Sequence, residues 1–204
     1  MKKGYTLAEV LITLGIVGVV AAITISVVVS KIQWTILKTQ YKKVYTTYSQ
    51  AIQLIQNENE TYPVECYYDN SGSVKFSDCK LFYDKLRENL KIVKYCEKNA
   101  LSNGCVPVYS SYNMTQGCYG FSENYINNKN TAWILNDGSI FIKYTYNHPF
   151  FAVDINGFKG PNKAGYDLFF YKIKAKNIGL YLDTLYGGCG WEAPGGKSGK
   201  DMLK

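Results

Sequence analysis

One carboxylate interrupts a run of residues that are otherwise apolar or small and weakly polar at the start of the chain. The run extends from Tyr5 to Val29, and the exception is Glu9. A charged side chain in such a segment costs free energy in lipid, unless another group pairs with it. Its presence therefore indicates a functional site. The first question is therefore which group neutralises this carboxylate.

The run itself is long enough to cross a membrane. As a helix, residues 5–29 would extend about 37 Å, which exceeds a hydrocarbon core of ~30 Å. Lys2 and Lys3 precede the run and Lys31 follows it, and a basic start favours an N-terminus in the cytoplasm. Three interpretations compete: a secretory signal cleaved near Ala22, a plain signal anchor, and a segment in which Glu9 has a role. Only the third explains the carboxylate.

The hexapeptide GYTLAE at residues 4–9 resembles the cleavage and methylation motif of type IV prepilins and type II secretion pseudopilins. The resemblance implies that a membrane aspartyl peptidase, the prepilin peptidase, cuts after Gly4 and methylates the new amine of Tyr5. The first mature residue in that family is usually Phe, and Tyr5 is an aromatic variant. The family's glutamate stands fifth in the mature chain, as Glu9 does, and neutralises the amine of a neighbouring subunit. We therefore expect assembly, and not the monomer, to satisfy this carboxylate.

A helical pattern continues beyond the membrane segment. Apolar residues recur there at spacings of three and four, at Trp34, Leu37, Tyr41, Val44, Tyr48, Ile52 and Ile55. We predict one helix of about 50 residues that ends near residues 56–60. Relatives commonly carry a proline near the place of Ser26, but none stands here, so no proline kink is predicted. The expected parts are a leader at 1–4, a transmembrane and assembly helix at 5–30, an amphipathic continuation at 31–59 and a globular head at 60–204.

The head is predicted to be rich in strands. We expect a short helix at 81–95 and a stapled loop at 96–125. Four strands are expected, at 131–135, 139–144, 150–155 and 167–176, and the first two flank an Asn-Asp-Gly turn typical of a hairpin. A long helix whose second half packs on an antiparallel sheet is an α+β fold. The resemblance implies the same pilin architecture independently.

Six cysteines follow the apolar run, and none of them belongs to a CxxC pair. They are Cys66, Cys79, Cys96, Cys105, Cys118 and Cys189. An even number on one side of a membrane segment indicates disulfides in an oxidising compartment. Sequence alone does not choose among the possible pairings. The pairing that we predict joins neighbours along the chain: Cys66–Cys79, Cys96–Cys105 and Cys118–Cys189.

A glycine-rich loop between two predicted strands carries several hard oxygen donors. They are Asp154, Asn156, Asn162 and Asp167. Such ligands suit calcium, and the segment resembles a D-x-N-G-x-x-G-P-N-x-x-G-x-D stretch of bacterial pilin-like proteins, some of which bind calcium near it. The spacing of an EF-hand fails, because Phe158 and Lys159 occupy its fifth and sixth places. The alternatives are a calcium site and a loop closed by Asx turns, and ligand geometry favours the latter.

Catalytic and phosphate-binding patterns are lacking, so we expect a protein that is not an enzyme. His148 is the one histidine of the sequence, and neither GxSxG nor HExxH occurs. The segment 195–200 departs from the spacing of a phosphate loop and is expected to be a flexible tail. Lysines of the predicted fourth strand and the loop before it are expected to be solvated, so nucleic acid is not the default partner. These lysines are Lys159, Lys163, Lys172, Lys174 and Lys176.

The resemblance implies a structural subunit, a pilin or pseudopilin, of a type IV pilus-like or type II secretion filament. The expected partners are the prepilin peptidase, copies of the chain or other pilins, and the bacterial inner membrane. The chain would cross that membrane once, with its N-terminus in the cytoplasm and its head outside, before it enters a pilus or pseudopilus. The alternative is an anchored minor pilin that binds DNA or a surface ligand, which its presence at filament tips would distinguish.

Overall fold

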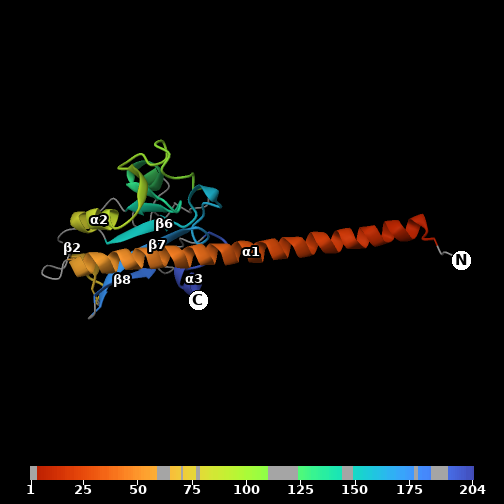
Figure 1. Ribbon diagram of the computed structural model, residues 1–204, viewed down its shortest axis with the longest axis horizontal. Coiled ribbons are helices and arrows are strands. Elements are labelled where there is room, and N and C mark those ends of the chain that lie inside the picture. Colours follow the sequence, from red (N-terminus) through yellow and green to blue (C-terminus); the bar gives the residue numbers. More distant parts are fainter. Residues whose placement is uncertain are drawn as a thin grey trace. The chain divides into compact units, whose positions relative to one another are not determined.

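The computed structural model describes residues 4–58, 65–69, 71–76, 79–109, 124–143, 149–176, 179–184 and 193–204. The chain divides into two compact units, Met1–Ile36 and Leu37–Lys204. The α-helices are α1 (Leu7–Glu58), α2 (Cys79–Glu88) and α3 (Gly199–Leu203) (Figure 1). The strands are β1 (Cys66–Tyr68), β2 (Val74–Phe76), β3 (Ile92–Cys96), β4 (Ala132–Leu135), β5 (Ile140–Lys143), β6 (Phe150–Asp154), β7 (Leu168–Lys176) and β8 (Gly179–Thr184).

The first unit is the apolar part of α1. Large side chains such as Leu11, Val17 and Ile23 are each more than 60% exposed there. Within the described residues, α1 is the one helix long and apolar enough to cross a membrane. The predicted helix is confirmed, with 52 residues and no break, and the Ser26 hydroxyl donates to the carbonyl of Ile23 within the helix. An apolar surface of this extent requires lipid or other apolar partners.

In the second unit, the remainder of α1 packs on one face of the sheet. The predicted stripe is buried from Leu37 to Ile55, and Tyr41, Tyr48 and Ile52 are each 0% exposed; its first member, Trp34, is only half-buried. The Tyr48 ring lies 6.0 Å from that of Phe141 and 5.6 Å from that of Phe151, centroid to centroid. Burial of each large side chain stabilises the fold by about 1.5–3 kcal/mol. The stripe is therefore the docking face of the head, as its spacing predicted.

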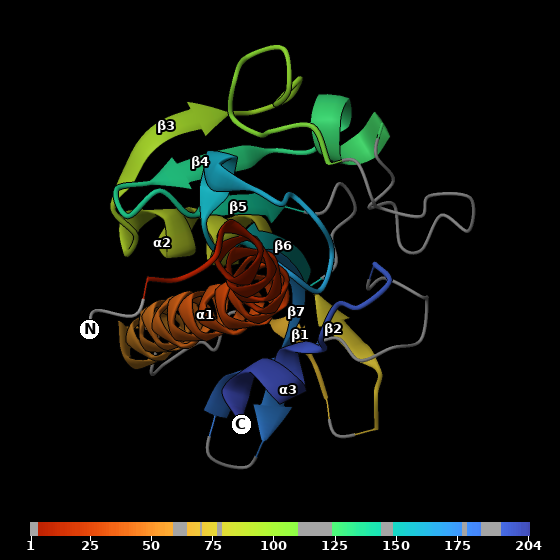
Figure 2. The same ribbon diagram turned by 90° about the vertical axis from the view of Figure 1, so that its right-hand side faces the viewer.

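The sheet has the order β2-β1-β7-β6-β5-β4-β3, and β8 also pairs with β7. The predicted hairpin is confirmed, because β4 pairs antiparallel with β5 and joins Trp133 to Phe141 in register. The continuations to β6 and β7 are antiparallel as well. The four predicted strands thus form the expected antiparallel meander, and β1, which was not predicted, runs parallel to β7 at Tyr68 and Lys174. The fold is α+β and pilin-like with a mixed sheet (Figure 2).

The other face of the sheet is covered by chain that follows β3. A second hydrophobic cluster forms there and includes Val106, Tyr109 and Ile126 with Ile142 and Phe170 of the sheet. The cover is a disulfide-closed loop and the π-helix Tyr125–Lys129. Sheet residues therefore alternate between the α1 face and this second core, as the period of a strand requires.

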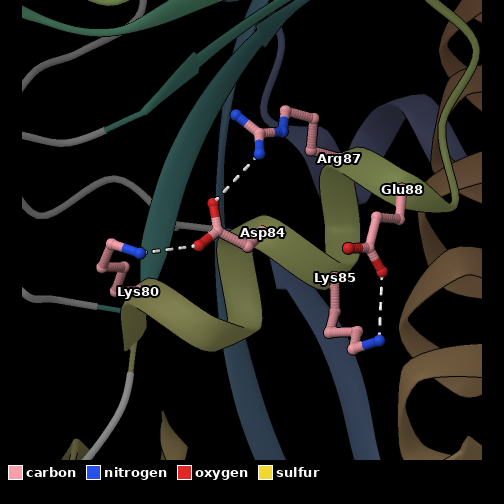
Figure 3. A network of polar contacts seen from close by, with 5 residues as sticks. All are labelled: Lys80, Asp84, Lys85, Arg87 and Glu88. Carbon is pink, nitrogen blue, oxygen red and sulfur yellow. Dashed lines mark hydrogen bonds and ion pairs between the residues drawn. The ribbon is translucent and has the colours of Figure 1, made fainter.

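The expected helix at 81–95 was half right. Helix α2 ends at Glu88, and Ile92–Cys96 forms the edge strand β3 against β4. Ion pairs join the exposed side chains of α2: Lys80 to Asp84 at 3.0 Å, Lys85 to Glu88 at 3.1 Å and Arg87 to Asp84 at 3.5 Å (Figure 3). Exposed pairs contribute about 0–1 kcal/mol each. Burial of side chains such as Phe82 and Leu86 therefore stabilises α2 more than its charges do.

The C-terminal segment is ordered, so the expectation of a flexible tail was wrong. The Ser198 side chain caps α3 by accepting a hydrogen bond from the backbone N–H of Asp201. Met202 is 1% exposed. Gly196 fits closely, because a Cβ there would lie 3.0 Å from the carbonyl oxygen of Ala164. The glycines of this segment permit close packing, although in the sequence they indicated flexibility.

Candidate functional site

The first candidate site is the N-terminus of α1, where Glu9 has a partner within its own chain. Its carboxylate oxygen Oε2 accepts hydrogen bonds from the backbone N–H of Thr6 at 2.8 Å and from the Thr6 hydroxyl at 3.0 Å. The Thr6 hydroxyl in turn accepts from the backbone N–H of Glu9 at 3.3 Å. This reciprocal arrangement is a capping box, in which the first and fourth residues of T-x-x-E satisfy each other. The expectation that the monomer leaves the carboxylate unsatisfied was wrong.

Sequence reasoning overlooked Thr6, although the spacing Thr6-Leu-Ala-Glu9 is itself a signal of a helix start. The residues nearby are accessible. Tyr5 is 86% exposed, and among the described residues, chain neighbours apart, no atom lies within 4 Å of where a Cβ of Gly4 would stand. A hollow of about 520 Å³ beside the cap is lined by Tyr5, Glu9, Val10 and Thr13. The Glu9 side chain therefore caps the start of α1 and also lines an open hollow that another group can enter.

The cysteines of the head form two disulfides among the described residues. Cys66 joins Cys79, and Cys96 joins Cys105, which confirms two of the three predicted pairs. The third predicted pair, Cys118–Cys189, lies outside the described residues, as does His148. Closing such short loops stabilises a fold by about 3 kcal/mol each in the chain-entropy model. Disulfides are typical of an oxidising compartment.

The second candidate site is the loop between β6 and β7, where two buried carboxylates accept hydrogen bonds from the backbone. Asp154 and Asp167 are each 0% exposed. Asp154 Oδ1 accepts from the N–H groups of Asn156 at 3.1 Å and Gly157 at 2.8 Å, and its Oδ2 accepts from the hydroxyl of Tyr109 at 3.1 Å. The two oxygens of Asp167 accept from backbone N–H groups of the same loop, at 2.7 Å each. All four carboxylate oxygens are therefore in use.

This geometry is what a loop closed by Asx turns requires. The backbone N–H groups that donate to these carboxylates carry partial positive charge, so they disfavour binding of a cation to the same oxygens. Two neutral oxygens, Asn156 Oδ1 and Asn162 Oδ1, are buried and have no hydrogen-bond partner, and these would suit calcium. Among the described residues, no three or more His, Cys, Asp or Glu side chains gather to hold a metal. The calcium site thus stays a prediction, and a melting curve measured with calcium and with chelator tests it.

A close approach at Gly157 locks this loop to the β4–β5 hairpin. Gly157 has φ +65°, and a Cβ there would collide with the carbonyl oxygen of Gly138. We expect Gly157→Ala to destabilise the head by about 2–5 kcal/mol, from the left-handed backbone plus the overlap. Thermal unfolding of the purified protein measures the change. Gly72→Ala is the matched control, because Gly72 has φ +83° but no atom within 4 Å, and it should cost only about 1–2 kcal/mol. Equal losses would contradict the packing argument.

The two carboxylates should also make the stability of the head depend on pH. Burial, and then the charge of nearby Asp167, raise the pKa of Asp154 well above its usual 3.8, and burial raises the pKa of Asp167. The folded state therefore binds protons more tightly than the unfolded chain does. The resulting contribution to the free energy of unfolding is complete below about pH 4. It is lost as pH rises through the folded pKa values, by up to about 1.4 kcal/mol per pH unit for each carboxyl group.

We accordingly expect the melting temperature of wild type relative to Asp154→Asn to fall from mildly acidic to neutral pH. The asparagine keeps an acceptor for the two backbone N–H groups but cannot ionise. Differential scanning calorimetry across this range measures the difference. A difference independent of pH would show that the buried pair does not titrate in this range.

The lysines of β7 face an acidic partner. Lys172 and Lys174 lie 3.8 Å and 3.2 Å from the carboxylate of Asp183 on β8, nitrogen to oxygen. The side chain of Lys176 is outside the described part. These cross-strand ion pairs reduce the charge that this strand presents to an anionic partner such as DNA.

One comparison with known families bears on the N-terminal site. Residues 1–25 match the family model described as Prokaryotic N-terminal methylation motif. The chain carries the prepilin signature of type IV pilins and pseudopilins. This signature implies processing by a prepilin peptidase and assembly with other pilins, and the apolar part of α1 fits anchoring in the inner membrane. No curated protein and no solved structure matches the chain.

Proposed function

We propose that this pilin-like protein is a structural subunit of a type IV pilus-like or type II secretion filament. The prepilin peptidase cleaves it after Gly4 and methylates the amine of Tyr5. The apolar part of α1 holds it in the inner membrane, with the N-terminus in the cytoplasm and the head outside. Removed from lipid, the same apolar surface polymerises with other subunits. The observation that carries the proposal is a carboxylate five residues after Gly4, in the apolar part of α1 that the protein does not bury.

The capping box explains how Glu9 is tolerated before assembly. Until a neighbour arrives, Thr6 supplies the carboxylate with two hydrogen bonds. Cleavage leaves the Thr6 N–H in place, because Thr6 is then the second residue. In the filament, the amine of a neighbouring Tyr5 takes over as the partner, and a charge-assisted bond is about twice as strong as a neutral one. Assembly thereby exchanges a local partner for a stronger one.

The two disulfides support a head outside the cytoplasm. The basic N-terminal residues Lys2 and Lys3 support a cytoplasmic start. Treating intact spheroplasts with protease tests this orientation. The head should be digested while the N-terminal segment is protected, and a protected head would refute the orientation.

Cells that lack the prepilin peptidase test the function itself. In them the chain should remain in the membrane at its precursor mass and be missing from sheared filaments. In cells with the enzyme, antibody labelling should follow the length of the filaments. Labelling at filament tips alone would instead support the alternative, a minor pilin that binds a ligand. A chain absent from filaments in both strains would refute the proposal.

A further inference from the structure

Two basic segments of the head lie side by side. The loop at 157–165 and the C-terminal segment at 193–204 are joined by backbone hydrogen bonds, from Ala193 N–H to the Ala164 carbonyl at 2.9 Å and from Lys197 N–H to the Gly165 carbonyl at 2.8 Å. The Tyr166 hydroxyl adds a bond to the carbonyl of Pro194 at 2.9 Å. The two segments therefore form one surface.

This surface lies at the end of the head where the chain arrives from the membrane segment. Gly199 at the start of α3 packs so tightly that a Cβ would lie 2.5 Å from the Tyr41 hydroxyl and 2.7 Å from Thr184. Tyr41 stands only four residues after Leu37, where the second unit begins. Figure 2 shows α3 beside α1 within the head.

The charge of this surface has one dominant sign. The two segments contain five lysines but one acidic side chain, Asp201, which pairs with Lys204 at 2.9 Å. Lys159, Lys197 and Lys200 are exposed. Phe158 beside them is 54% exposed, although an aromatic ring is costly to leave in water.

We propose that this basic surface, formed by Phe158, Lys159, Lys163, Lys197 and Lys200, docks on anionic phospholipid headgroups of the membrane that α1 spans. Lysines near an anionic bilayer are attracted within a Debye length of about 8–10 Å, and an aromatic ring suits the interface. Val29 and Tyr41 are twelve positions apart on α1, or about 18 Å along the helix. The chain itself therefore limits how far this end of the head can lie from lipid.

The bilayer fits this surface better than a protein partner does. Phospholipid headgroups offer many mobile charges of one sign, which a cluster of flexible lysines can follow without a fixed geometry. Docking would hold a waiting subunit against the membrane until it enters a filament. The inference rests on the proposed membrane anchoring but not on assembly, so it can fail while the proposed function stands.

The test uses full-length protein, one chain per nanodisc, in phosphatidylcholine alone or mixed with phosphatidylglycerol. Hydrogen exchange is measured on peptides covering 157–165 and 193–204. Exchange should slow in the anionic discs and recover in high salt. Each lysine removed should weaken docking roughly fivefold, so the double variant Lys159→Gln with Lys197→Gln should lose most of the protection.

The control keeps the same net charge. Lys91→Gln with Lys98→Gln removes two exposed lysines that flank the edge strand β3, and it should exchange like the wild type. Equal exchange in neutral and anionic discs would overturn the proposal. Protection that appears only with several chains per disc would overturn it too, and would show that the surface contacts other subunits. Incorporation into discs separately reports whether the anchoring holds.

Discussion

Protein purified from membranes is expected to begin at Tyr5 with a methylated amine. The prepilin signature covers residues 1–25, and the cleavage that it implies falls between Gly4 and Tyr5. Mass spectrometry of the intact protein and of its N-terminal peptide measures both changes. An intact Met1 terminus would refute processing, and a terminus near Ala22 would identify an ordinary secretory signal instead.

Gly4→Leu should abolish this processing and leave the precursor in the membrane. Among the described residues, its chain neighbours apart, no atom lies within 4 Å of where the new Cβ would stand, so the substitution creates no overlap there. Its effect must arise in the peptidase, where bulk beside the scissile bond displaces the substrate. A displacement of about 1 Å slows an enzymatic step on the order of a hundredfold.

Gly18→Leu is the matched control for this substitution. Gly18 also has no neighbour within 4 Å, and leucine suits an apolar helix at least as well as glycine. This variant should be processed normally. Equal loss of cleavage in both variants would mean that leucine anywhere in the helix impairs processing, which would remove Gly4 as the cleavage determinant.

The long helix and the hairpin could be predicted from the sequence because their signals are local. The stripe from Leu37 to Ile55 has the period of a helix, and Asn136-Asp137-Gly138 specifies its turn. Strand β3 was not predicted, because its residues have a helical pattern and only pairing with β4 makes them extended. Strands β1, β2 and β8 were not predicted either. A run of three residues, or one that begins at a glycine, carries little strand signal in the sequence.

In the candidate sites too, residues with a local sequence signal could be predicted and tertiary contacts could not. Glu9 could be found because a charge in an apolar run is conspicuous in any sequence. Its partner Thr6 could have been found from the T-x-x-E spacing. The hydrogen bond from Tyr109 to Asp154 joins residues 45 positions apart, so no local sequence pattern predicts it. The close fit of Gly199 against Tyr41 likewise depends on tertiary packing, so a glycine-rich C-terminus was mistaken for a flexible one.

Replacing the charge of Glu9 should prevent assembly while processing and membrane insertion continue. Glu9→Gln is sharper than an alanine substitution, because glutamine at this position of a capping box also accepts the hydrogen bonds of Thr6. The helix start is then preserved, and only the charge is lost. A neighbour's amine would enter the apolar filament core unpaired, which weakens subunit association on the order of a hundredfold or more.

Thr6→Val separates the cap from the charge. It removes the hydroxyl that bonds to Glu9 at 3.0 Å but leaves the backbone N–H that bonds at 2.8 Å. The helix start loses about 1 kcal/mol, yet the carboxylate remains available to a neighbour. Electron microscopy and sheared-filament yield should therefore show filaments from Thr6→Val and none from Glu9→Gln. The reverse result would make capping the essential role of Glu9, because the charge would then be dispensable for assembly.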